Sequence, residues 1–233
     1  MVNFAKLKAA QAAIEEIKNV QKTDAIIKIG LGTGSTARFF VDLLGEMVAN
    51  GYECICVPTS IETEKQALAL DIKLADIGDL GQLDVTVDGA DEIDPQLGLI
   101  KGGGGALLRE KIVASASKRM IVISDDSKMV EYLGAFPLPI EVNKFGLGAT
   151  KILIEKILGI DKKLELRKDK NNQVFVTDGG HFIYDAFFSR ISDAKTLSRQ
   201  LLDIAGVVQH GLFLDMCDTA FVASDDGVKR YDK

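Results

Sequence analysis

The chain has few cysteines, no excess of positive charge and no long hydrophobic run. Its cysteines, Cys54, Cys56 and Cys217, are odd in number and form neither a disulfide framework nor a zinc-binding spacing, so we expect a reducing cytoplasm. No segment approaches the length that spans a membrane, and the first residues lack the apolar core of a signal peptide. We therefore expect a cytoplasmic protein with no membrane partner.

Basic residues do not outnumber acidic ones. The formal net charge is −6, from 28 Lys and Arg against 34 Asp and Glu. This balance argues against non-specific binding to nucleic acid, which requires a basic surface. With 233 residues, 47% of them hydrophobic and 27% charged, the chain is long enough for one large or two modest globular domains.

Short apolar segments alternate with helical patterns in the first part of the chain. The pattern predicts helices over 4–18, 35–49, 61–70 and 106–118, and strands over 25–29, 53–57, 84–87 and 120–123. Strands that alternate with helices at this spacing indicate parallel βαβ units. Ligands bind beyond the carboxyl ends of such strands, where we expect Thr33 to Thr36, Asp88 and Ser124 to Lys128 to converge.

The pattern changes after Leu133, and Pro137-Leu-Pro139 predicts a break in regular structure. Beyond it, the sequence predicts short strands at 164–166, 174–176 and 182–184, with helices at 147–158 and 193–204. Strands joined by turns form antiparallel sheets. We expect the chain to return to the first sheet from Val207 onward. The prediction is an α/β fold in which residues 1–133 and 207–233 form a mostly parallel sheet domain and 134–206 form a smaller inserted α/β domain.

The most informative stretch runs from Asp88 to Glu110. Its four consecutive glycines, Gly102 to Gly105, can take backbone angles closed to other residues and let a ligand approach bare peptide N–H groups. Because a helix is predicted to follow them, they lie at the positive end of a helix dipole. This arrangement would stabilise an anion, or an oxygen that becomes one during a reaction.

Glu110 is the candidate general base in this stretch. On the predicted helix it shares a side with the small residues Ala106, Val113, Ala114 and Ser117, which would crowd water away from it. Desolvation of this kind raises the pKa of a carboxyl group toward the range of a general base. The alternative is that Arg109, Glu110 and Lys111 form a solvated helix face and that the glycines form a flexible loop.

A second glycine motif, Gly32-Thr-Gly-Ser-Thr-Ala37, follows the first predicted strand and opens a helix. It fits the loose G-x-G-x-x-A pattern of dinucleotide-binding loops, but the second predicted strand lacks the acidic residue at its end that would bind a ribose hydroxyl. No lysine follows the glycines, which excludes the P-loop of nucleotide triphosphatases. The loop suits one terminal phosphate on a small molecule. A tight turn with a purely structural role is the alternative.

Four carboxylates, those of Asp88, Asp91, Glu92 and Asp94, could together hold a divalent metal ion. Lys101 favours a site without metal, because its ammonium group would supply the positive charge that a metal otherwise brings. We therefore predict no metal.

The ordered set of motifs resembles the ribose-5-phosphate isomerases of the A type over nearly the whole chain. The motifs are Gly32-Thr-Gly-Ser-Thr-Ala37, Val87-Asp-Gly-Ala-Asp-Glu-Ile93, Ile100-Lys-Gly-Gly-Gly-Gly-Ala106, Arg109-Glu-Lys111, Ser124-Asp-Asp-Ser-Lys128, Phe136-Pro-Leu-Pro139, Thr177-Asp-Gly-Gly-His181 and Gly206-Val-Val208. The resemblance implies a Rossmann-like domain with a smaller α/β domain, assembly as a homodimer or homotetramer, and a sugar phosphate as the substrate. It implies interconversion of ribose 5-phosphate and ribulose 5-phosphate in the pentose phosphate pathway, without metal or other cofactor.

The resemblance also implies roles for single residues. Glu110 matches the general base of the family, and Lys128 matches a substrate-binding lysine. The positions implied to bind the substrate are Thr33, Gly34, Ser35 and Thr36 near the phosphate, and Asp88, Gly89, Ala90, Asp91, Lys101, Gly102, Gly103 and Gly104 around the sugar. Lys6 is a further candidate near the phosphate, in an open register with Lys8.

The chemistry of an aldose–ketose isomerase suits these residues. The proton on C2 is removed and returned to C1 through an enediolate, and one base beside both carbons, Glu110, can perform both steps. Lys101 and the N–H groups of Gly102 to Gly104 would stabilise the oxyanion. Because the sugar arrives mostly as a ring, Asp88 or Asp91 would carry the proton that opens it. The sequence does not divide this role between the two.

Two other kinds of protein share this general pattern. The first is a non-catalytic effector module that binds sugar phosphates, as in some transcription regulators. Those proteins carry a basic helix-turn-helix ahead of the module, whereas here the first strand is expected near residue 25. The second is an acyl-CoA-handling protein, which would bind CoA. Glu110 favours the isomerase over both.

Overall fold

The structure is a computed structural model of the chain and describes residues 4–20, 26–159 and 162–233. The chain forms two compact units. The first unit contains residues 1–90, 109–128 and 215–233, and the second contains 91–108 and 129–214. The domain boundaries predicted above stay a prediction; the compact units differ from them in assigning 91–108, 129–133 and 207–214 to the second unit.

The first unit is built on a six-stranded sheet. Its strands lie in the order β13-β12-β6-β3-β1-β2, and only β13 is antiparallel to its neighbour. The strands are β1 (Ile27–Leu31), β2 (Cys54–Pro58), β3 (Val85–Asp88), β6 (Met120–Asp125), β12 (Thr219–Ser224) and β13 (Gly227–Asp232). The helices are α1 (Phe4–Val20), α2 (Ser35–Ala49), α3 (Ile61–Ala69), α4 (Ile77–Leu80), α5 (Leu107–Ser115, in this unit from Arg109 on) and the 3-10 turn η1 (Asp126–Lys128).

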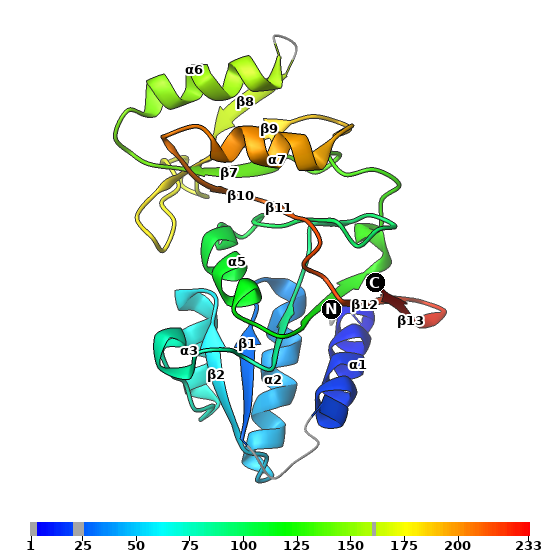
Figure 1. Cartoon of the computed structure of the whole chain (residues 1–233). Helices are drawn as coiled ribbons and strands as arrows, with labels where there is room; N and C mark the ends of the chain where they lie inside the picture. Colours follow the sequence, from blue (N-terminus) through cyan, green and yellow to red (C-terminus); the bar gives the residue numbers. More distant parts are fainter. Residues whose placement is uncertain (1–3, 21–25, 160–161) are drawn as a thin grey trace. The chain divides into compact units, whose positions relative to one another are not determined.

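Among the described residues, the parallel strands of this sheet have the doubly wound order 2-1-3-4-5 when counted along the chain. The chain passes from β1 to β2 on one side and then returns to β3 on the other side of β1 (Figure 1). In sheets of this kind the reversal opens a crevice at the carboxyl ends of the two strands that flank it, which here are β1 and β3. The fold therefore marks one edge of the first unit as the place for a ligand.

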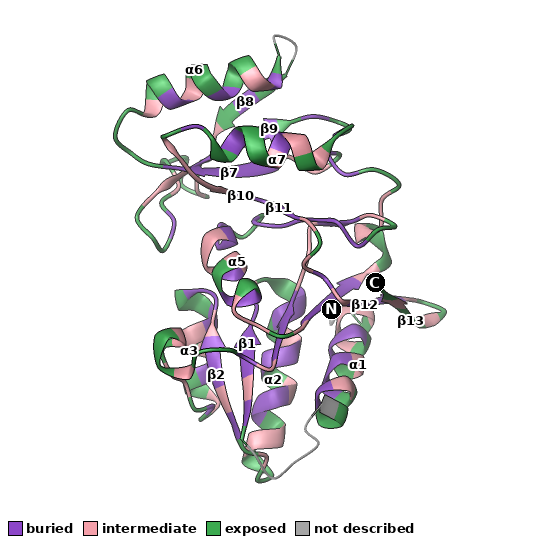
Figure 2. Cartoon of the chain, in the orientation of Figure 1, coloured by how far each residue is buried: buried purple, intermediate pink, exposed green. Residues whose placement is uncertain are grey.

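The core of the first unit lies between this sheet and the helices α1 and α2. Phe40, Val41 and Leu44 of α2 are fully buried against strand residues such as Ile29 and Val87. Figure 2 shows the buried stripe along α2 with exposed residues on its other side. The central strands β3 and β6 are buried over nearly all their length, as expected for parallel strands covered on both faces.

The second unit contains two antiparallel sheets. A four-stranded sheet has the order β10-β7-β9-β8, and a three-stranded sheet has the order β11-β5-β4. The strands are β4 (Glu92–Ile93), β5 (Leu99–Ile100), β7 (Leu138–Val142), β8 (Lys163–Leu166), β9 (Phe182–Phe187), β10 (Val207–His210) and β11 (Leu212–Phe213). The helices α6 (Leu147–Leu158) and α7 (Ala194–Leu202) pack on the larger sheet through Ile154, Leu197 and Leu201. The predicted α/β class, with a mostly parallel sheet and a smaller part that contains antiparallel strands, is confirmed.

Three sequence-based expectations are wrong. The segment 174–176 is no strand, because Val174 and Val176 are exposed and Val174 makes only an isolated bridge to Lys168. Pro139, expected in a break, lies in β7, where its carbonyl accepts the N–H of Gly211 at 2.8 Å. After Val207, β12 and β13 join the six-stranded sheet as expected, but β10 and β11 belong to the sheets of the second unit.

Most other elements match the prediction within a few residues. The expected strand at 25–29 is β1, which continues to Leu31, while Ala25 lies outside the described residues. Helix α3 begins where the Ser60 side chain accepts the N–H of Thr63 at 3.1 Å, a typical N-cap. No helix among the described residues is both long and apolar enough to cross a lipid bilayer.

Candidate functional site

The first glycine loop leaves β1 and packs directly on the end of β3. The N–H of Gly32 donates to the carbonyl of Val87 at 2.9 Å. A Cβ at Gly32 would lie 2.2 Å from Oδ1 of Asp88 and 2.5 Å from its Cα, so no larger residue fits without a backbone shift. The loop and the carboxylate at the end of β3 are thus built together, at the strand reversal described above.

Thr33 connects this loop to the segment after β2. Its Oγ1 lies 2.7 Å from the hydroxyl of Thr59 and 2.8 Å from that of Ser60. The hydroxyl of Thr63 in turn donates to the carbonyl of Gly32 at 3.0 Å. The resemblance implied that Thr33 lies near the phosphate, and this stays a prediction. In the structure its hydroxyl is part of a hydroxyl network that fixes the shape of the loop.

Ser35 and Thr36 form the first turn of α2, after Gly34 with φ 114°. The ammonium group of Lys6 donates to the hydroxyl of Ser35 at 2.8 Å and lies 3.9 Å from Oδ2 of Asp125. This end of α2 therefore combines a helix N-terminus with a lysine, and both attract an anion. Lys128, the other lysine of the prediction, ends η1 and is partly buried.

Asp88 is the last residue of β3 and is completely buried. Its Oδ1 accepts two backbone N–H groups, from Thr33 at 3.1 Å and from Gly89 at 2.7 Å. Gly89 and Ala90 follow directly in the chain and are partly buried. The structure thus joins Asp88 to the first glycine loop.

Glu110 lies in the first turn of α5 and is 4% exposed. Val113 and Ala114 on the same helix are also buried, as the sequence predicted. The alternative of a solvated helix face is therefore wrong for Glu110. A buried carboxylate in a helix first turn is an expected feature of a general base, and its role stays a prediction.

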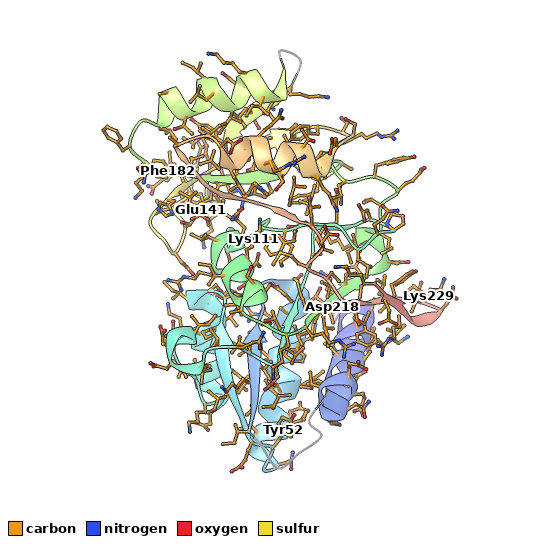
Figure 3. All side chains as sticks on the ribbon, in the orientation of Figure 1. Tyr52, Lys111, Glu141, Phe182, Asp218 and Lys229 are labelled. Carbon is orange, nitrogen blue, oxygen red and sulfur yellow. The ribbon has the colours of Figure 1, made fainter. Side chains whose placement is uncertain are left out.

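Lys111 was missed by the sequence reasoning, which gave it no role of its own and discussed its exposure only in the alternative of a solvated helix face. It is partly buried on α5 (Figure 3), and burial lowers its pKa from 10.5 to about 7, with the neighbouring Glu110 opposing this shift. Its position next to Glu110 was the only sequence feature that could have indicated a buried residue, because the helical pattern alone places a lysine on the exposed face.

In the second unit, Lys101 follows β5 and is 2% exposed. Its N–H donates to the carbonyl of Gly211 at 2.9 Å, and its ammonium group lies 5.4 Å from the ring centre of Phe213. Gly211 is needed there, because a Cβ would lie 2.2 Å from the Lys101 carbonyl oxygen. The chain therefore holds a lysine in an almost fully buried position beside an aromatic ring, an arrangement that is rare without a functional or structural demand.

The second glycine loop follows Lys101. Gly102 and Gly105 have φ angles of 100° and 81°, which favour glycine, and the N–H of Gly105 closes a turn onto the carbonyl of Gly102 at 2.9 Å. The N–H of Gly103 donates to Oδ2 of Asp91 at 2.7 Å. The structure thus brings Asp91 and the glycine loop together, and Gly104 lies exposed in the middle of the loop.

The carboxylates considered as metal ligands have other uses in the second unit. Glu92 is buried and accepts the backbone N–H groups of Gly134, at 2.7 Å, and of Phe136. Asp94 accepts the N–H groups of Gln96 and Gly98 at 2.9 and 2.8 Å. The part of the chain that the structure describes contains no group of three or more His, Cys, Asp or Glu residues arranged to hold a metal ion.

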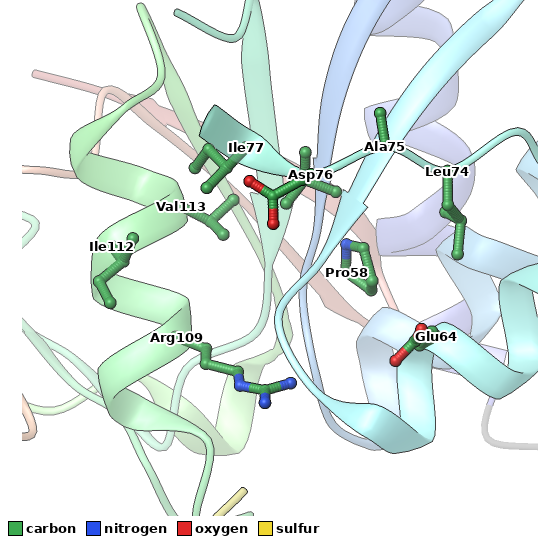
Figure 4. A pocket seen from close by; sticks show the side chains of 10 residues that line it. Pro58, Glu64, Leu74, Ala75, Asp76, Ile77, Arg109, Ile112 and Val113 are labelled. Atoms are coloured by element: carbon green, nitrogen blue, oxygen red, sulfur yellow. The ribbon is translucent and has the colours of Figure 1, made fainter. Parts of the chain in front are cut away.

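A pocket of about 570 Å³ lies elsewhere on the first unit, where α5 faces the end of β2, α3 and residues 74–77 (Figure 4). Arg109 extends into it from α5. Its lining residues are Val57, Pro58, Glu64, Leu74, Ala75, Asp76, Ile77, Arg109, Ile112 and Val113. None of the predicted site residues lines it.

A doubly wound sheet with a glycine loop and a buried carboxylate at its strand reversal defines an α/β protein of the class that binds ligands at that edge. The comparison with protein families is more specific. The family model described as ribose 5-phosphate isomerase A (phosphoriboisomerase A) matches residues 55–227. The chain belongs to this family.

Individual relatives agree over nearly the whole length. The ribose-5-phosphate isomerase A of Rhodopseudomonas palustris (strain TIE-1) is 52% identical over 231 residues, which cover 98% of this chain and 97% of the relative. A solved D-ribose-5-phosphate isomerase in complex with phospho-erythronic acid is 39% identical, with a TM-score of 0.90 and complete coverage of both chains. The ribose 5-phosphate isomerase A structure from Methanocaldococcus jannaschii is 35% identical, with a TM-score of 0.86 and 98% coverage of each chain.

Proposed function

We propose that this chain interconverts D-ribose 5-phosphate and D-ribulose 5-phosphate, the reaction of the non-oxidative branch of the pentose phosphate pathway. Membership of the family carries this proposal, together with full-length relatives that bear the name of the enzyme. This interconversion is an intramolecular oxidoreduction, because C1 of the sugar is reduced while C2 is oxidised. A small sugar phosphate is therefore the substrate, and the reaction needs neither metal nor other cofactor.

Glu110 is the proposed general base. It removes the proton from C2 of the open-chain aldose and returns it to C1, so that no proton is gained or lost overall. Its burial at 4% exposure supports this role, because a carboxylate that is kept from bulk water exchanges its proton less readily before the return step. The electron pair of the broken C2–H bond moves toward the carbonyl oxygen O1 and forms the enediolate. The hydroxyl proton on O2 passes to O1 before C1 is protonated, which leaves the ketone at C2.

Lys101 is the proposed electrostatic partner of that oxygen, with amides of the second glycine loop. A donor fixed in advance at the developing oxyanion is typically responsible for about two to three orders of magnitude in rate. The N–H of Gly103 donates to Asp91. The amides of Gly102 and Gly104 are therefore the better candidates for the oxyanion than that of Gly103.

We assign phosphate binding to the first loop. The helix N-terminus at Ser35 and Thr36, the amide of Gly34 and the ammonium group of Lys6 suit a dianion, and Lys128 is a further cationic candidate. Thr33 acts mainly through its hydroxyl network, which holds the loop in shape.

Ring opening requires a group that accepts the proton of the anomeric hydroxyl and one that donates to the ring oxygen. Asp88 and Asp91 are the proposed carriers, with Gly89 and Ala90 between them in contact with the sugar. The carboxylate of Asp91 accepts the backbone N–H of Gly103, whereas Oδ1 of Asp88 accepts two backbone N–H groups. This difference favours Asp91 as the more adaptable proton carrier.

The assembly and compartment belong to the same proposal. We propose a homodimer or homotetramer in the cytoplasm, with no nucleic-acid and no membrane partner. Three observations support this proposal: the resemblance to the family, the acidic net charge of −6, and the presence of three cysteines that form no disulfide bond among the described residues.

The decisive experiment is a coupled assay of ribulose 5-phosphate formation, with and without EDTA, on the unchanged protein and on Glu110→Gln. We expect EDTA to have no effect and Glu110→Gln to lower kcat by about two to four orders of magnitude, because the amide cannot accept a proton. The exposed Glu46 on α2 gives the matched control Glu46→Gln, which should keep full activity. Near-normal turnover by Glu110→Gln would refute the assignment of the base. Binding of the sugar phosphate without any turnover by the unchanged protein would instead indicate the effector module.

A further inference from the structure

Arg167 follows β8 in the second unit and is fixed by Asp185 on the neighbouring strand β9. Its Nε donates to Oδ2 of Asp185 at 2.9 Å, and its Nη2 donates to Oδ1 of the same carboxylate. The backbone N–H of Arg167 also donates to the carbonyl of Ile183 at 2.8 Å. The Arg167 side chain is only 12% exposed. Two parallel hydrogen bonds of this kind fix both the position and the plane of a guanidinium group.

The third nitrogen of this guanidinium group, Nη1, contacts the second glycine loop. Its Nη1 donates to the carbonyl oxygen of Gly102 at 2.7 Å and to that of Gly103 at 3.2 Å. The side chain of one residue thus contacts two successive peptide groups of the loop. No sequence pattern indicated this contact, because Arg167 lies far from the glycines along the chain.

The planarity of the peptide group gives this contact a consequence. In a trans peptide the carbonyl and the N–H of the next residue point in opposite directions. The peptide that joins Gly102 and Gly103 is therefore held at both ends, by Arg167 at its carbonyl and by Asp91 at its N–H. The next peptide has its carbonyl on Arg167, so the N–H of Gly104 points away from the guanidinium group.

Phe175 supports the far end of the loop. A Cβ at Gly105 would lie 2.4 Å from ring atoms of Phe175, so the ring packs directly on that glycine. The N–H of Phe175 donates to the carbonyl of Arg167 at 2.9 Å, and the Arg167 guanidinium lies 6.0 Å from the centre of the ring. The segment from Arg167 to Phe175 therefore contacts both ends of the glycine loop, Arg167 at Gly102 and Phe175 at Gly105.

We propose that Arg167, fixed by Asp185, is a positioning residue of the isomerase: it sets the orientation of the Asp91 carboxylate and of the Gly104 N–H. The inference rests on the proposed function, because it assigns these two groups to the sugar. Arg167 does not touch the reacting atoms. It acts through the two peptides that it holds, and a lysine cannot replace it because an ammonium group lacks the planar fork.

The experiment measures kcat and KM for ribose 5-phosphate, together with Tm, for Arg167→Met, Arg167→Lys and Asp185→Asn. We expect kcat to fall about 10- to 100-fold in Arg167→Met with KM changed less than about threefold, because misplacement of catalytic groups acts on the reaction step. Arg167→Lys should recover little, and Asp185→Asn should show a smaller loss. Arg190 stacks on Tyr132 in the same unit, 3.5 Å from the ring centre, and Arg190→Met is the matched control with unchanged kcat.

A double-mutant cycle separates positioning from general stability. Gly103→Ala moves the Asp91 carboxylate directly, so adding Arg167→Met should reduce kcat by much less than the product of the two single effects. Multiplicative losses would indicate independent structural roles and would overturn the proposal, as would full kcat in a folded Arg167→Met protein. If Arg167→Met does not fold, a wild-type kcat in both Arg167→Lys and Asp185→Asn overturns it. Absence of turnover by the unchanged protein would overturn the proposed function as well, and so is distinguishable from failure of this inference alone.

Discussion

The two glycine loops of the molecule are held in place by different means. The first, at Gly32, packs on the backbone of Asp88 and is tied by hydroxyl groups around Thr33. The second, at Gly103, packs on the end of the Asp91 side chain and is held by the guanidinium group of Arg167. The first loop is thus a part of the folded sheet, whereas the second is oriented by side chains. The difference predicts that one loop serves stability as much as binding, and the other mainly activity.

The largest expected effect is on the second loop. In Gly103→Ala, the new Cβ would lie 2.6 Å from Oδ1 of Asp91, and the carboxylate can move away because it ends a side chain. We expect kcat to fall about 100-fold or more while Tm changes by less than about 2 °C. Steady-state kinetics and thermal unfolding check this. Gly148→Ala on α6, where nothing lies within 4 Å, is the control and should keep full kcat.

The first loop should show the opposite pattern. In Gly32→Ala, the Cβ would meet the Asp88 backbone at 2.5 Å, so β1 and β3 must separate or the loop must shift. Overpacking of this kind lowers the free energy of unfolding by about 1–3 kcal/mol. Urea unfolding measures it. A Gly32→Ala protein as stable as the unchanged one would remove the basis of the comparison.

The third prediction concerns charged side chains on the helices that follow the loops. On α2, Arg38 forms an exposed ion pair with Glu62 at 2.8 Å, whereas on α5 the partly buried Lys111 has a pKa of about 7. Because the unfolded chain holds this proton up to about pH 10.4, it binds more protons than the folded chain between about pH 7 and 10. The stability of the unchanged protein should therefore gain about 1 kcal/mol per pH unit in this window from Lys111 alone.

The test compares urea unfolding of the unchanged protein and of Lys111→Met between pH 7 and 9. The stability advantage of Lys111→Met should shrink as the pH rises, because the unchanged protein loses its buried charge. Lys65, exposed on α3, gives the control Lys65→Met, whose difference from the unchanged protein should stay constant. A constant difference for Lys111→Met would show that Lys111 is not desolvated.

Local pattern was sufficient for most of the fold. Helix α2 was predicted with its observed bounds because a glycine turn starts it and its apolar residues repeat at helical spacing. The strand predicted at 174–176 is absent because β-branched residues favour strands only where neighbouring chain segments cover them. Val174 and Val176 are exposed instead. The expected break at Pro139 was wrong because a proline can lie near the start of a strand, and β7 begins one residue earlier, at Leu138.

The candidate site shows the same limit. Burial of Glu110 followed from the small residues on its helix face, which are local in sequence. Burial of Lys111 and the contact of Arg167 with Gly102 depend on chain segments that meet only in the folded protein. The residues around Arg167 in the sequence do not indicate its contact with Gly102. The sequence therefore predicted the second glycine loop but not the side chain that fixes it.

The position of β12 has a consequence for the synthesis of the protein. This strand lies between β6 and β13 in the six-stranded sheet, yet it is made after the entire second unit. Until residues 219–224 leave the ribosome, the outer edge of β6 has no strand to pair with, and its apolar row Met120 to Ile123 lacks its final cover. Unpaired apolar edges attract other chains. The nascent protein is therefore most prone to aggregation after β6 has been synthesised and before β12 has left the ribosome.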